Sequence, residues 1–569
     1  MSKLSAACVV AGSVLVFSAA DANLVKPYAA PVAVLINQVG YDQAAAKNLV
    51  VQVRDPEPNQ PSTFKLVDES GKTVFQGKLV TRGRIHSGCA SDWGARYWTG
   101  DFNGFKKSGT YRALVQMGSQ DISSFPFRIG KRVVFRQTVE AAARFFYWQR
   151  CGFAIPGIHA ACHLDDAKIP EKLGGGHRDV TGGWHDAGDY NKYNGFTPHA
   201  VYALVTLARG SGPLLTGGVK RRSLKEAKWG ADFILKMWQR GTGIMYYNVF
   251  AGYHYMGPPE RETDNIVGTG DDRPIEGEGP YPMAAAALAA LASASHERKY
   301  REAAEDLWRG ASAALKSSKA LPISPARFNS ELLLADLEME RLTGERRYYG
   351  AARERVERVL ALQGSDGLWP PDMVAYGVPP AALAQFSRTH PDDSEDPKVR
   401  SALRRWLVQS LRRADNPFEI TPWSAGVFFC PSKDMGGLHS VYLSQAWALY
   451  LAGDILRDQR AGALADRQID WVLGENPDDV CFMEGQGSYN LPRYHHAYEG
   501  NPNRGQPGIP GQERGAIPGA IPNGLCRRPG SSEDKPWADF AGISYESNEP
   551  WLPHNTYYIL ATLAQAAKQ

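Results

Sequence analysis

The stretch Phe127–Tyr147, FRIGKRVVFRQTVEAAARFFY, marks the point where the chain changes from a strand pattern to a helix pattern. Its first residues close a series of short β-branched and aromatic runs. From Val133 onward the apolar residues recur at helical spacing, on one face of a helix. The residues on that face are Val133, Phe135, Val139, Ala142, Ala143, Phe146 and Tyr147. This change of period predicts a β domain followed by an α domain.

Residues 31–130 have the pattern of a β domain. Short runs rich in β-branched and aromatic residues are separated by turn signals such as Asp68-Glu69-Ser70-Gly71-Lys72. About 100 residues of short strands are typical of an immunoglobulin-like β-sandwich. The predicted strands include residues 32–36, 48–53, 63–67, 111–115 and 125–129.

Residues 131–569 have the pattern of an all-α domain. Loops of very unequal length separate the predicted helices, and no fixed sequence period indicates a solenoid. We therefore predict a closed ring of six helical hairpins, an (α/α)6 barrel. The predicted helices cover residues 132–150, 198–209, 222–240, 281–294, 299–317, 328–343, 346–362, 378–388, 397–413, 440–453, 458–473 and 554–568.

The N-terminus resembles a secretory signal. Lys3 precedes an apolar run from Leu4 to Ala20, and Ala20-Asp21-Ala22 offers a small-x-small cleavage site. We predict a signal peptide at residues 1–22 and a secreted or periplasmic protein that leaves the membrane after cleavage. The alternative is a single membrane anchor, for which the run is short.

The composition narrows the class of partner. Lys and Arg number 64 against 60 Asp and Glu, so the net charge of +4 argues against nucleic acid as a partner. The 14 Trp and 25 Tyr offer flat faces on which sugars stack, although cores use the same residues. We expect a monomer without an organic cofactor.

The densest cluster of chemically useful residues is Thr181–Tyr193, TGGWHDAGDYNKY. Asp186 and Asp189 stand three residues apart and can converge on one water molecule, and Trp184 and Tyr190 offer stacking faces beside them. Hydrolysis of a glycosidic bond needs a carboxylate base for water and a carboxylic acid for the leaving oxygen. The alternative is an Asp-rich turn whose side chains cap backbone amides.

The second carboxyl is predicted near the C-terminus, at Glu549. Tyr545, Trp551 and neighbouring prolines would partly desolvate it, and desolvation raises the pKa of a carboxyl toward that of a general acid. The alternative is an acidic residue that favours the start of the last helix through the helix dipole.

These motifs together resemble glycoside hydrolase family 9, the inverting cellulase family, with its N-terminal immunoglobulin-like domain. The resemblance implies that Asp189 is the general base, that Asp186 helps to hold the water, and that Glu549 is the general acid. It implies a cellulose or related β-glucan substrate with β-1,4 bonds. The blocks similar to the family are Leu35–Tyr41, Tyr147–Gly152, Cys162–Asp166, Gly182–Tyr193, Leu473–Pro477, Ile517–Ala520 and Asn548-Glu549.

The substrate-binding His-His-Arg block of the family is represented by His495, His496 and Ala497. Because Ala497 stands where the family has Arg, the subsite contacts depart from the family pattern. Arg493 or Arg504 is a candidate substitute. The predicted substrate-binding residues are Trp184, Tyr190, Arg493, His495, His496, Tyr545 and Trp551.

A second cluster has the ligands of a metal site. Two thiolates and two imidazoles suit a tetrahedral structural zinc, which some family members carry at the matching positions. The alternative is a Cys151–Cys162 disulfide, favoured by export. The predicted zinc ligands are Cys151, Cys162, His163 and His185.

Calcium is a further metal that family members often bind, near an Asp-Glu-Leu helix start. The block reads Ser330-Glu331-Leu332 here, so one carboxylate is missing and no calcium ligands are predicted.

Three functions compete. We expect an endoglucanase-like enzyme first. The loop Asn265–Tyr281 carries Asp271, Asp272, Glu276 and Glu278, which could attract an amino sugar or could simply be solvated. An exo-acting β-glucosidase or exo-β-glucosaminidase is therefore the second reading, and a non-catalytic carbohydrate-binding protein is the third.

Overall fold

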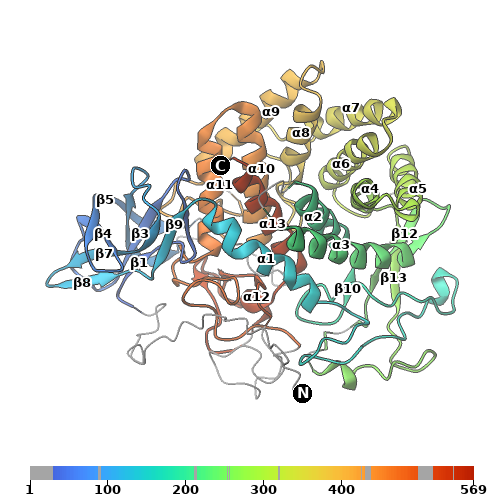
Figure 1. Ribbon diagram of the computed structural model, residues 1–569, viewed down its shortest axis with the longest axis horizontal. Coiled ribbons are helices and arrows are strands. Elements are labelled where there is room, and N and C mark those ends of the chain that lie inside the picture. The colour runs from blue at the N-terminus through green and yellow to red at the C-terminus, as the bar shows by residue number, and fades with distance from the viewer. Residues whose placement is uncertain are drawn as a thin grey trace, which may run out of the picture.

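The computed structural model describes residues 30–87, 91–210, 215–252, 254–255, 257–317, 321–424, 426–429, 438–497, 517–542 and 544–568. The predicted signal peptide and Arg504 lie outside these ranges. Figure 1 shows the described chain as a β-rich part, drawn in blue, beside a larger helical part.

The β-rich part is a sandwich whose two layers share one long strand. Antiparallel pairing orders β1, β3, β6 and β5 in one layer, and β5 continues into the second layer through β4, β7 and β9. Side chains from both layers, among them Phe64, Trp98 and Phe127, form a separate buried core. The strands are β1 (Val32–Leu35), β2 (Gly40–Asp42), β3 (Asn48–Arg54), β4 (Thr63–Asp68), β5 (Thr73–His86), β6 (Asp92–Asp101), β7 (Gly109–Met117), β8 (Gln120–Ser123) and β9 (Phe127–Gly130).

The helical part contains two classes of helix. In one class nearly every residue is buried, as in the Ala-rich α4, and a helix that is apolar all round belongs in an interior. In the other class a single face is buried. The inner helices are α2 (Thr197–Gly210), α4 (Pro282–Ser295), α6 (Pro325–Thr343), α8 (Val378–Thr389), α10 (His439–Leu456) and α13 (Leu552–Ala567). The outer helices are α1 (Val133–Trp148), α3 (Gly217–Met237), α5 (Arg298–Ala314), α7 (Arg346–Ala361), α9 (Asp396–Arg413) and α11 (Gln459–Val472).

The six inner helices close a ring. Each contacts the next in the order α2, α4, α6, α8, α10 and α13, and α13 contacts α2 again. This arrangement confirms the predicted (α/α)6 barrel, and each predicted helix corresponds to one of these twelve. The structure adds the short α12 (Tyr545–Asn548) and a small sheet of β10 (Lys192–Tyr193), β11 (Trp238–Gln239), β12 (Ile244–Val249) and β13 (Ile275–Gly279). The predicted helix at 222–240 therefore ends earlier, at Met237.

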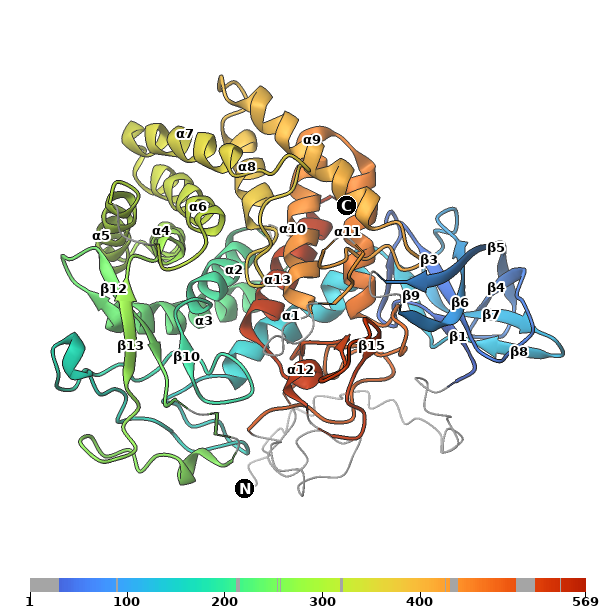
Figure 2. The ribbon, with the colours of Figure 1, turned by 180° about the vertical axis from the view of Figure 1, so that it is seen from behind.

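The functional loops gather at one end of the barrel. In a ring of hairpins the segments that precede the inner helices all emerge at the same end. The longest of these precede α2 and α13, and they carry β10 and α12. Figures 1 and 2, seen from opposite sides, both place β10, β13 and α12 along one edge of the helical part.

The sandwich packs directly on the barrel. The block Leu35–Tyr41 leaves the strand conformation after Leu35 until β2 begins at Gly40, and its polar side chains bind residues at and just after the end of α11. Asn37 Nδ2 donates to Asp470 Oδ1 at 2.7 Å, and the Tyr41 hydroxyl donates to Glu475 Oε2 at 3.3 Å. Because these groups are buried, the block holds the two parts together. None of the helices in the described ranges is long and apolar enough to cross a bilayer.

Candidate active site

The loop with Asp186 and Asp189 lies between α1 and α2 and is fixed by backbone hydrogen bonds at both ends. His185 N donates to Gln149 O at 2.8 Å, just after α1. Asp186 N donates to Asn191 O at 3.0 Å, and Asp186 O accepts from Leu552 N, at the start of α13, at 2.9 Å. The loop is thereby held against the helix that follows Glu549.

Gly188 allows the C-terminal segments to approach the two aspartates. Its N–H donates to Glu549 Oε1 at 3.1 Å, and its carbonyl accepts from Ala497 N at 2.7 Å. A Cβ at this position would lie 1.9 Å from the carbonyl oxygen of His495 and 3.2 Å from Glu549 Oε1. Glycine is therefore required here by close packing.

The three carboxyl groups form one cluster, and two of them, Glu549 and Asp186, have raised pKa values. Burial, then the neighbouring charge of Asp189, raises the pKa of Glu549 well above its ordinary value, and the Gly188 N–H offsets this only partly. Burial and the charges of Asp189 and Glu549 likewise raise the pKa of Asp186, whose Oδ2 accepts from Trp551 Nε1 at 3.2 Å. These shifts favour the protonated form of Glu549, which is the form that a general acid needs.

Asp189 has a different set of partners. The backbone N–H of Asn191 donates to its Oδ1 at 2.9 Å, and Asn191 Nδ2 donates to its Oδ2 at 3.1 Å. His254 Nδ1 is also hydrogen-bonded to Asp189 Oδ2. The sequence reasoning missed His254, because it stands in an irregular loop far from both catalytic motifs.

The loop of Glu549 is held by a residue that the sequence reasoning also missed. Asn523 N donates to Glu549 O at 2.9 Å, and Asn523 Nδ2 donates to Tyr545 O at 2.8 Å. Asn523 Oδ1 lies 2.8 Å from Nε2 of the buried His554 on α13. Asn523 thereby joins the segment of Glu549 to the helix that follows it.

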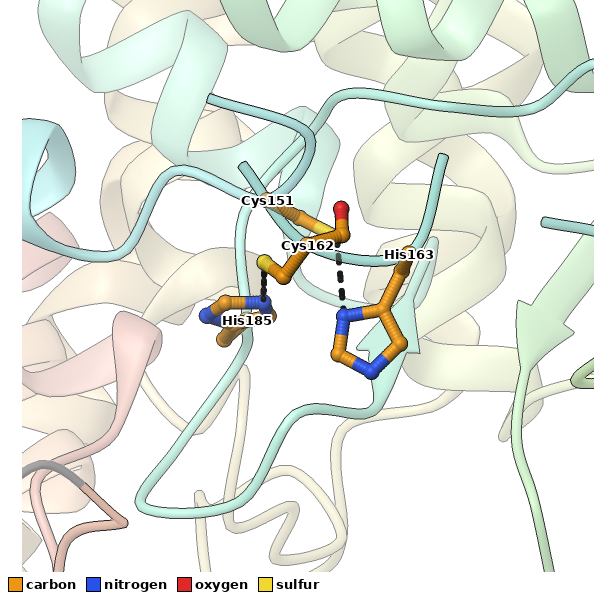
Figure 3. A group of neighbouring side chains, drawn as sticks. All are labelled: Cys151, Cys162, His163 and His185. Carbon is orange, nitrogen blue, oxygen red and sulfur yellow. Dashed lines mark hydrogen bonds between the residues drawn. The ribbon is translucent and has the colours of Figure 1, made fainter. Parts of the chain in front are cut away.

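The four predicted metal ligands come together beside the loop of Asp186, which His185 directly precedes. Figure 3 shows the two imidazoles pointing toward the two sulfur atoms. Cys151 Sγ lies 3.8 Å from His163 Nδ1, and Cys162 Sγ lies 3.7 Å from His185 Nε2. All four ligand atoms lie within 4.8 Å of one another, and both cysteines are free thiols rather than a disulfide. These separations fit four ligands around one tetrahedral ion.

Buried charged groups support the cluster from outside. His163 Nε2 lies 3.1 Å from Glu262 Oε2, the carboxylate–histidine arrangement that orients a metal-binding imidazole. Asp166 is paired with Lys192 at 2.7 Å and with Arg273, and all three are fully buried. The buried Asp166 thus has two opposite charges beside it, and these pairs join the loops around the cluster.

The comparisons with known proteins agree with this architecture. The model of the glycosyl hydrolase family 9 matches residues 135–562, and the model of the cellulase N-terminal ig-like domain matches residues 29–119. The first match covers well over half of the chain. The chain belongs to glycosyl hydrolase family 9. Its sandwich is the N-terminal domain found with such enzymes.

Individual relatives of this family 9 chain are distant. A cellodextrinase of Butyrivibrio fibrisolvens is 30% identical over 242 residues, which cover 39% of the chain and 40% of that relative. The crystal structure of a metagenome-derived family 9 endoglucanase matches with a TM-score of 0.71 at 23% identity, covering 94% of the chain and 99% of that structure. A zinc-binding triple mutant of another family 9 endoglucanase matches with a TM-score of 0.69 at 23% identity, covering 92% and 99%.

Three residues predicted to contact sugar are closed off from solvent, and that prediction is wrong for them. Trp184 is fully buried, and its Nε1 donates to Glu226 Oε1 at 2.8 Å. Tyr190 packs its ring on His185 and His163 and donates to Gly257 O. His496 is buried with Nε2 2.7 Å from Gln149 Oε1. These residues belong to the scaffold of the site.

The other predicted contacts lie at the surface of the site. Tyr545 is 38% exposed and its ring lies near that of His495, which is half-buried. Trp551 is half-buried between Asp186 and Phe196. Arg493 is also half-buried, and its backbone carbonyl accepts from Asn548 Nδ2. Each of these four side chains has surface left to contact a ligand.

The block considered for calcium has a positive side chain bound to its glutamate. Arg327 Nε donates to Glu331 Oε1 at 2.6 Å, Arg327 Nη2 donates to Gly195 O at 2.7 Å, and Asp372 lies 3.8 Å from the same guanidinium. A guanidinium among these oxygens already supplies the positive charge that a calcium ion would bring.

Proposed function

We propose that this family 9 protein is an inverting glycoside hydrolase of β-1,4 bonds in cellulose or related β-glucans, with endoglucanase-like action. The observation that carries the proposal is the grouping of three carboxyls around Gly188, where the Gly188 N–H binds Glu549, whose pKa is raised, and Asn191 binds Asp189. The chain spans about 40% of the cellodextrinase and 21% of an endoglucanase D of Acetivibrio thermocellus, so the activity and substrate rest on this site.

The carboxyls divide the reaction between them. Glu549 gives its proton to the glycosidic oxygen as the bond from that oxygen to the anomeric carbon breaks. A water molecule attacks the anomeric carbon from the opposite face, and Asp189 takes the proton that the water loses. Asp186 holds the water by a hydrogen bond. Attack from the opposite face inverts the anomeric configuration, and inversion needs carboxyls about 6.5–9.5 Å apart to admit the water.

The proposal is tested by removing each proton-transfer group without changing its shape. Asp189→Asn and Glu549→Gln should each lower kcat by at least ~10²-fold, the usual contribution of a positioned acid or base. Binding of a cello-oligosaccharide, measured by calorimetry, should persist. Unchanged turnover in Asp189→Asn would refute the assignment of the base. A wild-type protein that binds cello-oligosaccharides but never hydrolyses them would support the carbohydrate-binding alternative.

We propose that Cys151, Cys162, His163 and His185 hold one structural zinc ion. The free thiols, the ligand separations and the Glu262 partner of His163 support it. With four protein ligands the ion has no open position for substrate, so its contribution is to fix the loop. His185 immediately precedes Asp186, and the ion would therefore fix the entry to the catalytic loop. Calcium stays a prediction without assigned ligands.

We also propose the surrounding organisation of the chain. Residues 1–22 form a signal peptide, residues 31–130 the sandwich domain and residues 131–569 the catalytic domain. The mature protein is a secreted or periplasmic monomer. An extracellular place suits a polymeric substrate, and the buried polar contacts of Asn37 and Tyr41 support two domains that act as one body.

An exo-acting enzyme with a preference for amino sugars is the second candidate. Glu276 supports it, because this exposed carboxylate on β13 lies near Tyr193; burial, Asp186, Asp189 and Glu276 together raise the pKa of that phenol. Asp271 and Asp272 do not support it, since their carboxylates accept hydrogen bonds from Asp264 N and Gly268 N within their own loop. Release of glucosamine from chitosan oligomers, with no internal cleavage of cello-oligosaccharides, would favour this candidate.

A further inference from the structure

We propose that His254 is a positioning residue that holds the base Asp189 ionised and correctly oriented at acidic pH. The proposal rests on the proposed function, in which Asp189 accepts the proton of the attacking water. It adds to that function a residue that stands outside both catalytic motifs and touches the base directly.

The position of His254 is built into the fold around Asn191. Strand β12 pairs with β10, where Val249 faces Lys192 and Asn248 faces Tyr193. Just beyond β12, Ala251 N donates to Asn191 Oδ1 at 3.3 Å. Asn191 also donates to both oxygens of Asp189, through its backbone N–H and through Nδ2. One residue therefore aligns the base and the segment that leads to His254.

The contact places the imidazole on Asp189 Oδ2, the oxygen that also accepts from Asn191 Nδ2. His254 Nδ1 meets Asp189 Oδ2, while the backbone N–H of Asn191 meets Oδ1. The imidazole packs beside the ring of Phe250, and its side chain is 64% exposed, whereas that of Asp189 is 4% exposed. His254 therefore approaches the base from the solvent side, where substrate and water must also enter.

The charges explain why the base needs such a partner. The charge of Asp189 raises the pKa of Asp186 and of Glu549, so the ionised base lies among carboxyls close enough to feel its charge. Among the described residues, Asp189 is the charged group that acts on His254. The hydrogen bond from His254 to Asp189 raises the pKa of the imidazole, and partial burial opposes this shift. The imidazolium consequently persists to a higher pH than in a free histidine.

The sign of the effect follows from this pairing. Below the raised pKa of His254 the positive imidazolium stabilises the ionised Asp189, and this stabilisation is lost as the pH rises through that pKa. The benefit to catalysis is therefore greatest on the acidic side of the pH profile. A residue that merely supported the fold would change the rate equally at every pH.

The test is the pH profile of kcat/KM on a cello-oligosaccharide for the full mature chain. In His254→Ala the midpoint of the acidic limb should rise by about one pH unit, a tenfold change in the ionisation equilibrium, and the loss of rate should be larger at about pH 5 than at about pH 8.5. His254→Gln keeps a neutral donor and should shift the limb by less. His390→Ala, which removes a partly buried histidine paired with Glu340 on the inner helix α6, is the matched control and should leave the limb in place.

Two outcomes would overturn the proposal. One is an acidic limb in His254→Ala that coincides with that of the wild type. The other is a loss of rate that is uniform across the pH range. Because the side chain is largely exposed, the melting temperature of His254→Ala should match that of the wild type, so misfolding is detected separately. If Asp189→Asn is inactive while the His254 variants behave like wild type, the inference fails and the proposed function stands; if Asp189→Asn is active, the proposed function itself fails.

Discussion

The substitution Gly188→Ala tests how closely the two halves of the site are packed. An added Cβ would lie 1.9 Å from the carbonyl oxygen of His495, and an ordinary carbon–oxygen contact is about 3.3 Å. The segment of His495, or the loop of Gly188, must therefore move by roughly 1.4 Å. The same Cβ would lie 3.2 Å from Glu549 Oε1, so the movement also disturbs the acid.

The expected result is a large loss of rate with a retained fold. Misplacement of a reacting group by about 1 Å can cost ~10²-fold in rate, and overpacking of this kind usually costs about 1–3 kcal/mol in the free energy of unfolding. Steady-state kinetics and denaturant unfolding measure the two effects. Gly350→Ala is the matched control, because this exposed glycine inside α7 has open space around its position and should keep full activity. A folded Gly188→Ala enzyme with kcat within twofold of the wild type would refute the packing argument.

Three further changes test other parts of the account. Elemental analysis should find one zinc per wild-type chain and none in His163→Ala, whose melting temperature should also be lower; an active enzyme whose intact mass shows a Cys151–Cys162 disulfide would contradict the zinc proposal. Trp184→Ala should lower the free energy of unfolding by about 3–5 kcal/mol in a denaturant titration, since this ring is core, and a stability equal to the wild type would contradict its burial. Burial raises the pKa of Asp336 to about 8, so the folded protein keeps this proton longer than the unfolded chain, and stability falls as the pH rises toward 8. Asp336→Asn should flatten that fall in melting temperatures measured between about pH 5 and pH 8.

The overall architecture was predictable because it depends on periodicity. The stripe that begins at Val133 and the Ala-rich run of α4 each predicted a helix that the structure contains. Strand β5 was missed because irregular pairing with β6, at Thr81/Gly83 and at Arg84/His86, disrupts its alternation, and most of its residues are exposed. Strand β10 was missed because a two-residue pairing leaves no periodic signal.

The chemistry of the site was predictable in kind but not in every contact. The metal ligands were recognised from residue type and come together in space. Trp184 and Tyr190 were predicted to bind substrate because aromatic residues next to carboxylates are as typical of a sugar-binding site as of a hydrophobic core. Only the fold shows that Trp184 binds Glu226 and that Tyr190 packs its ring against His185. His254 reaches Asp189 through a loop whose course no local pattern specifies.

The central claim is that Asp189 and Glu549 act from opposite faces of the sugar with a water molecule between them. Proton NMR of the first product released from a β-linked cello-oligosaccharide tests it most directly, because the anomeric signals are read before mutarotation mixes them. The account predicts that the α-anomer appears first and the β-anomer grows in later. A β-anomer as the first product would show retention of configuration and would contradict the account.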